Sequence, residues 1–141
     1  MSWLVDTNIV SELRKGDRAS DGIGSWFAGT REEELFTSVL VLGELRRGVE
    51  SIRRRDIAAA AALDQWLDRL VTNFADRVLP VDAPIADRWG RLNVPDPIPT
   101  VDGLLAATAL VHDLVLVTRN TRDIVRTGVR LLDPTAGSSR T

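Results

Sequence analysis

Cysteine and tyrosine are absent from this chain, and histidine and lysine occur once each, as His112 and Lys15. The absence of cysteine excludes disulfides, thiolate metal sites and cysteine nucleophiles. A single histidine excludes the paired-histidine chemistry of acid–base ribonucleases, and a single lysine leaves little room for lysine-dependent catalysis. The chemistry still open to this chain is that of its 20 carboxylates.

A long apolar run and a strong net charge are also missing. No segment approaches the roughly 20 apolar residues of a membrane span, and no basic stretch followed by an apolar one suggests a signal peptide. We therefore expect a cytoplasmic protein without a membrane partner. The formal net charge of −2 provides no overall positive field for nucleic acid, so such binding would need a local patch.

The 141 residues fit one domain. We place it at residues 1–134 and expect residues 135–141 to form a disordered tail. Short apolar runs alternate with segments of helical periodicity, which is typical of α/β proteins with a parallel sheet. Strands are predicted at 3–5, 35–38, 78–81, 114–117 and 129–132, and helices at about 7–16, 23–27, 41–51, 56–74, 82–92, 101–112 and 121–126.

Two acidic residues are predicted at the ends of strands. Asp6 directly follows the apolar run of the first strand, and Asp123 comes shortly after the strand at 114–117. In a parallel sheet both fall at the carboxyl edge, where α/β folds bind ligands. A structural role stays open for each, because Asp6 is also a good helix cap and Asp123 alone would be an ordinary surface acid.

Two further acids stand in apolar surroundings. Glu44 interrupts the run 39–45, where a buried charge needs a cationic partner such as Arg46 or Arg47. Asp102 opens the most apolar helix of the chain, where helix capping is the alternative role. Four carboxylates that converge at one sheet edge cannot all stay ionised without a counter-charge. Mg²⁺ or Mn²⁺ is the natural counter-charge, and such an ion supports hydrolysis of phosphodiester bonds by activated water.

A set of short segments carries a family resemblance. They are Leu4–Asn8, Gly43–Gly48, Asp102 with Ala106 and Ala107, Thr118–Asn120, and Asp123. In this order and spacing they resemble PIN-domain proteins, and most closely the VapC toxins of bacterial toxin–antitoxin pairs in the FitB-like subgroup. The likeness extends from Trp3 to about Pro134. It implies an α/β fold, a three-layer α/β/α PIN domain with a central, mostly parallel sheet.

The resemblance also implies a function and partners. It implies the toxin of a type II toxin–antitoxin system, an endoribonuclease that needs Mg²⁺ or Mn²⁺ and cuts tRNA or ribosomal RNA. The implied partners are a VapB-type antitoxin that blocks the site, operator DNA contacted only through that antitoxin, and a second copy of the chain in a homodimer. The expected products carry 5′-phosphate and 3′-hydroxyl ends.

Site residues are carried over position by position. Asp6, Glu44 and Asp102 match the first three acids of the family, as catalytic residues and metal ligands. The fourth acid stands at either of two positions in different family members, and we predict that Asp123 supplies it here. The polar residues predicted to hydrogen-bond to these carboxylates are Thr7, Asn8, Thr118 and Asn120, the last of which shares a face with Asp123 if that stretch is helical.

Other functions remain open from the sequence. A phospho-acceptor receiver domain is also a small α/β fold with an acidic pocket, but it needs a lysine after a late strand, where this chain has Thr118 and Arg119. A PIN-fold binding module without nuclease activity and a DNA-directed nuclease are further alternatives. The dense arginine cluster in 46–55 predicts either a track for the RNA backbone or a surface that is solvated or contacts the antitoxin.

Overall fold

A computed structural model describes residues 1–15 and 21–137. Within these residues, a five-stranded sheet has the order β3-β2-β1-β4-β5. All of its pairings are parallel, so the predicted sheet is confirmed. The strands are β1 (Trp3–Val5), β2 (Leu35–Ser38), β3 (Val78–Leu79), β4 (Val115–Val117) and β5 (Leu131–Leu132).

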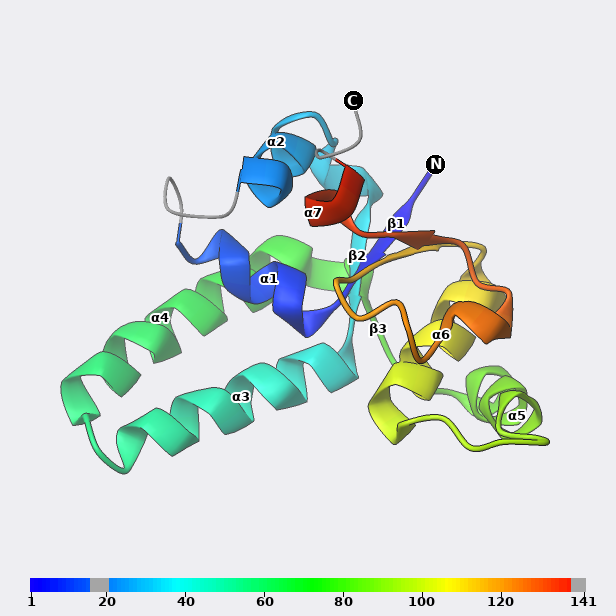
Figure 1. Ribbon diagram of the computed structural model, residues 1–141. Coiled ribbons are helices and arrows are strands. Elements are labelled where there is room, and N and C mark those ends of the chain that lie inside the picture. The colour runs from blue at the N-terminus through cyan, green and yellow to red at the C-terminus, as the bar shows by residue number, and fades with distance from the viewer. Residues whose placement is uncertain (16–20, 138–141) are drawn as a thin grey trace.

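Helices cover both faces of this sheet. Figure 1 shows α1, α3 and α4 on one side and α5 and α6 on the other, which confirms the three-layer α/β/α class. None of the described helices is both long and apolar enough to cross a bilayer. The helices are α1 (Thr7–Leu13), α2 (Asp21–Ala28), α3 (Val39–Arg53), α4 (Ile57–Phe74), α5 (Ala83–Leu92), α6 (Thr100–His112) and α7 (Pro134–Gly137), with 3₁₀ turns η2 (Glu32–Glu34), η3 (Ala75–Arg77) and η4 (Val125–Thr127).

The core lies along the central strands. Leu4 and Val5 of β1 and all residues of β4 are buried, as expected for parallel strands covered on both faces. The apolar helix α6 is also buried as predicted, and it packs closely on α5. A Cβ atom built on Gly103 would lie 3.2 Å from the indole of Trp89, so the glycine permits this close approach of the two helices.

Side-chain caps set where several helices begin. The Ser38 hydroxyl accepts a hydrogen bond from the Leu40 N–H at 3.0 Å, so α3 begins at Val39, two residues before the predicted start. Asp6 caps α1, which is the structural role that the sequence left open for it. The predicted site residue and the helix cap are therefore the same side chain.

The structure departs from the prediction toward the C-terminus. The expected helix at 121–126 is wrong, because this stretch forms a turn followed by η4, which ends at Gly128 with φ of 80°. A segment this short rarely nucleates a helix by itself. Residues 135–137 of the predicted tail belong to α7, whereas residues 138–141, like the end of the first predicted helix at Gly16, lie outside the described residues.

Candidate active site

The strand order brings the carboxyl ends of β1 and β4 together. Val5 and Val117 are register partners, and the Asp6 N–H donates to the Val117 carbonyl at 3.0 Å. Within the sheet, β1 has β2 as its neighbour at one edge and β4 as its neighbour at the other. The chain first passes from β1 to β2 and β3, and later returns to the opposite edge of β1 as β4. Such a reversal opens a crevice outside the strand ends, and Asp6 and Thr118 face each other there.

Asp6 is buried and accepts several hydrogen bonds. Its side chain is bonded by the Thr7 N–H at 2.6 Å, the Thr118 hydroxyl at 2.7 Å and the Asn8 amide at 3.4 Å. Burial raises the pKa of Asp6 above its usual 3.8, the bonds from Thr118 and Thr7 oppose this, and the charge of Glu44 adds to it. The carboxylate is thus held in place while its negative charge is poorly compensated.

Glu44 reaches the same place from the second turn of α3. Its Oε1 accepts a hydrogen bond of 2.6 Å from the Thr7 hydroxyl, and its Oε2 lies 4.0 Å from Nη2 of Arg47. Arg46, the other predicted partner, instead pairs with Asp64. Of the two predicted partners, Arg47 is therefore the one that lies near Glu44.

Asp102 lies in the first turn of α6, where the helix dipole favours a negative charge. The Asn120 amide donates to its Oδ2 at 2.9 Å. Partial burial raises the pKa of Asp102, and the charges of Asp6, Asp123 and Glu44 raise it further against the opposing hydrogen bond from Asn120. Asp102 therefore lies close enough to the other three predicted acids to be affected by their charges.

Asn120 and Asp123, the two candidates for the family's fourth acidic position, lie in different surroundings. The Asn120 N–H donates to Thr118 Oγ1 at 3.0 Å, so Asn120 joins Asp102 to the Thr118–Asp6 pair. Asp123 is exposed on the following turn, and it acts on Asp102 through its charge. Because this stretch is not helical, the shared helical face considered for Asn120 and Asp123 does not form.

Most of the predicted site residues line one hollow of about 320 Å³, here called the acidic hollow. The sequence left Arg46 and Arg47 open as partners of Glu44, and it did not single out Arg119, whose backbone N–H donates to Asn8 Oδ1 at 3.2 Å. Helical spacing from Glu44 points to Arg47, whereas no local pattern identifies a contact across 111 positions. The lining residues are Asp6, Thr7, Asn8, Glu44, Arg47, Asp102 and Asn120.

The donor set of the acidic hollow fits a hard divalent cation. Asp6, Glu44 and Asp102 offer carboxylate oxygens, which Mg²⁺ and Mn²⁺ prefer, and their mutual repulsion is what a cation would relieve. Among the described residues, no three aspartate, glutamate, histidine or cysteine side chains are gathered closely enough to hold a metal ion as they stand. The fit therefore rests on the chemistry and placement of the donors.

Comparison with known proteins identifies the family. The model of the PIN domain family matches residues 3–129. The chain belongs to the PIN domain family. Toxin FitB of Neisseria gonorrhoeae is 27% identical to it, and VapC ribonuclease Y4jK of Sinorhizobium fredii is 30% identical, each alignment covering 93% of this chain and 96% of the relative. The crystal structure of FitAcB from Neisseria gonorrhoeae superimposes with a TM-score of 0.87 at 27% identity, over 94% of this chain and 98% of that one.

Membership in the PIN domain family removes the receiver-like alternative. Lys15, the one lysine of the chain, pairs with Glu12 at the end of α1 at 2.5 Å. The residues that follow β4 in this PIN domain are Thr118 and Arg119, so a receiver-type lysine is absent from the position that such a domain requires.

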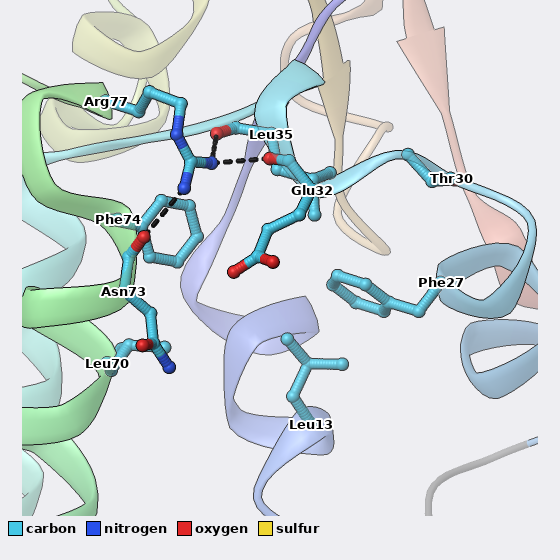
Figure 2. A pocket seen from close by; sticks show the side chains of 9 residues that line it. All are labelled: Leu13, Phe27, Thr30, Glu32, Leu35, Leu70, Asn73, Phe74 and Arg77. Carbon is cyan, nitrogen blue, oxygen red and sulfur yellow. Dashed lines mark hydrogen bonds between the residues drawn. The ribbon is translucent and has the colours of Figure 1, made fainter.

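A second hollow of this PIN domain lies away from the carboxylates. It measures about 250 Å³ and is bordered by α1, α2 and the end of α4 (Figure 2). The Arg77 guanidinium at its edge donates to the carbonyls of Leu35 at 2.6 Å and Asn73 at 2.7 Å, and so joins α4 to β2. None of the predicted site residues borders it. Its lining residues are Leu13, Phe27, Thr30, Glu32, Leu35, Leu70, Asn73, Phe74 and Arg77.

Proposed function

We propose that this PIN domain is the toxin of a type II toxin–antitoxin pair and an endoribonuclease that hydrolyses RNA with the help of Mg²⁺ or Mn²⁺. The observation that carries the proposal is the convergence of Asp6, Glu44 and Asp102 on one hollow at the carboxyl edge of the sheet. Its similarity to Toxin FitB and to a VapC ribonuclease supports the toxin and ribonuclease assignment.

The acidic residues would hold the metal. We assign Asp6, Glu44 and Asp102 as ligands, with Asp123 as the fourth acid, because its charge reaches Asp102. When bound, such an ion supplies the positive charge that activates water and stabilises the charge building on the phosphate. A carboxyl group whose pKa is raised by burial and by neighbouring charges, as at Asp102, is typical of functional sites.

Polar neighbours would keep the carboxylates in position. The Thr7 hydroxyl orients Glu44, the Thr118 hydroxyl orients Asp6, and the Asn120 amide orients Asp102. His112 is at the opposite end of α6 from Asp102, about 15 Å along the helix axis, so histidine acid–base chemistry does not enter. Hydrolysis by activated water forms no covalent enzyme intermediate, and we expect 5′-phosphate and 3′-hydroxyl ends.

The partners follow from the same assignment. A VapB-type antitoxin would bind this chain and block the acidic hollow, and the chain would form a homodimer in the cytoplasm. Operator DNA would be bound through the antitoxin and not by this chain alone.

Cleavage of RNA by the purified protein tests the proposal. A panel of total RNA and tRNA would be incubated with Mg²⁺, Mn²⁺ or EDTA, and the fragment ends would be mapped. We expect discrete fragments that require metal, and a loss of more than about a hundredfold in rate for Asp6→Asn. Asp68→Asn, a substitution on the exposed face of α4, is the matched control and should cleave normally.

Three results would contradict the proposal in different ways. Fragments with 2′,3′-cyclic phosphate ends would exclude direct attack by water. Absence of cleavage with every metal, in a folded protein that binds no Mn²⁺ by calorimetry, would favour a PIN-fold binding module instead. Cleavage of DNA in preference to RNA would keep the chemistry and change the substrate.

A further inference from the structure

The arginines of α3 separate into two groups with different partners. Asp64 on α4 accepts from Arg46 Nη1 at 2.6 Å and from Arg53 Nη2 at 2.8 Å. Glu50 accepts from the same two arginines at 3.1 and 2.9 Å. Two cations are thus balanced by two anions, and the network joins α3 to α4. These two arginines already have carboxylate partners within the chain.

Arg47 has a different environment. It stands one helical turn after Glu44, and its side chain is 83% exposed. Its Nη2 lies 4.0 Å from Glu44, the outer limit of an ion pair. The other charged residues that line the acidic hollow are carboxylates, so among the described lining residues Arg47 carries the positive charge.

A phosphate that approaches this hollow is repelled by its carboxylates and attracted by Arg47. Asp6, Glu44 and Asp102 repel it, and the chain as a whole is slightly acidic. An arginine at the rim presents a planar fork of N–H donors that fits a phosphate, and its long side chain allows it to turn from Glu44 toward a ligand.

From this arrangement we infer that Arg47 binds a backbone phosphate of the RNA beside the scissile bond. Its guanidinium contacts substrate and draws the polyanion over the carboxylates. The inference rests on the proposed function and adds to it the residue that anchors the substrate. Of the arginines in 46–55, the inference assigns an RNA contact near the site to Arg47 alone.

The test compares Arg47→Gln with Arg54→Gln, each made in an Asp102→Asn background that blocks cleavage. Arg54 is exposed at the end of the same helix, about 10 Å farther along it, and its substitution removes the same charge. The probe is a short fluorescein-labelled single-stranded oligoribonucleotide, with binding followed by fluorescence anisotropy. Circular dichroism checks that each variant is folded.

We expect Arg47→Gln to weaken RNA binding by about tenfold and to make the dependence of log Kd on log salt shallower by about 0.7, the value for one lost contact to single-stranded nucleic acid. Arg54→Gln should change the Kd less than about twofold. Arg47→Lys keeps the charge and should retain most of the affinity. In the cleavage-competent protein, Arg47→Gln should raise KM with little change in kcat.

Specific results would overturn the inference. Equal losses for Arg47→Gln and Arg54→Gln would indicate a diffuse field and not an anchor. Unchanged RNA binding with weaker antitoxin binding would assign Arg47 to the protein partner. Unchanged RNA binding with tighter Mn²⁺ binding would make it a counter-charge for the carboxylates. Failure of the wild type to cleave any RNA would contradict the proposed function, while the binding comparison would still decide the role of Arg47.

Discussion

The Thr118 hydroxyl donates a 2.7 Å hydrogen bond to Oδ2 of Asp6, across 112 positions of sequence. The pair joins the ends of β1 and β4, and the Thr118 oxygen also accepts from the Asn120 N–H at 3.0 Å. One hydroxyl therefore fixes a buried carboxylate and the loop that carries the partner of Asp102.

Removing the Thr118 hydroxyl should destabilise the protein. Thr118→Val leaves Oδ2 of Asp6 with the long bond from Asn8, so we expect a loss of about 1–3 kcal/mol in the free energy of unfolding at neutral pH. Urea denaturation measures this loss. Thr108→Val is the control, because that buried hydroxyl donates within its own helix to the Leu104 carbonyl. Equal losses for the two variants would contradict a special role for Thr118.

The pKa shift of Asp102 predicts the pH dependence of stability. Because its pKa is raised on folding, the folded chain holds the proton more tightly than the unfolded chain. The stabilisation from this group is complete below the usual pKa of 3.8 and is lost as pH rises through the raised value.

Asp102→Asn removes that charge at every pH. In EDTA we expect the variant to melt at a higher temperature than wild type at about pH 8, with the difference shrinking toward about pH 4. Thermal unfolding followed by circular dichroism measures this, and Asp68→Asn controls for the loss of a surface charge. A variant that is less stable than wild type at about pH 8 would show that hydrogen bonding outweighs repulsion at Asp102.

The Thr7 hydroxyl should matter for activity through Glu44. Thr7→Val removes the 2.6 Å bond to Oε1 and frees the glutamate to move, so we expect about a ten- to hundredfold loss of Mn²⁺ affinity or cleavage rate. Thr7→Ser keeps the hydroxyl and should retain most of the Mn²⁺ affinity and of the cleavage rate. Calorimetry with Mn²⁺ measures the metal affinity separately from the cleavage rate. Normal metal binding and cleavage in Thr7→Val would mean that Glu44 needs no orientation.

Two glycines of α2 should respond oppositely to alanine. A Cβ atom on Gly22 would lie 2.3 Å from the Pro134 carbonyl oxygen, so Gly22→Ala must push α7 away and should cost about 1–3 kcal/mol. Gly24 has no neighbour within 4 Å of its Cβ position, and Gly24→Ala should stabilise the helix by about 0.5–1 kcal/mol. Chemical denaturation of both variants tests whether α7 is docked on α2; stabilisation by Gly22→Ala would show that it is not.

Local sequence patterns predicted much of the fold. The apolar run at Trp3–Val5, the periodicity of 56–74 and the buried helix at 101–112 each became the expected element, because periodicity reports which side of a segment is buried. The helix expected at 121–126 failed because too few residues support a nucleus and the turn bonds of Thr121 replace it.

The candidate site was also predicted from the sequence only in part. The sequence by itself determined that Asp6, Glu44 and Asp102 stand where a solvated surface does not explain them, since strand ends and apolar runs are local properties. The tertiary structure alone decided which groups meet. The order β3-β2-β1-β4-β5 places Thr118 beside Asp6. The packing of α3 on α4 pairs Arg46 with Asp64, whereas Arg47 lies at the acidic hollow. Contacts between residues so distant in sequence depend on how the layers pack, which no local pattern records.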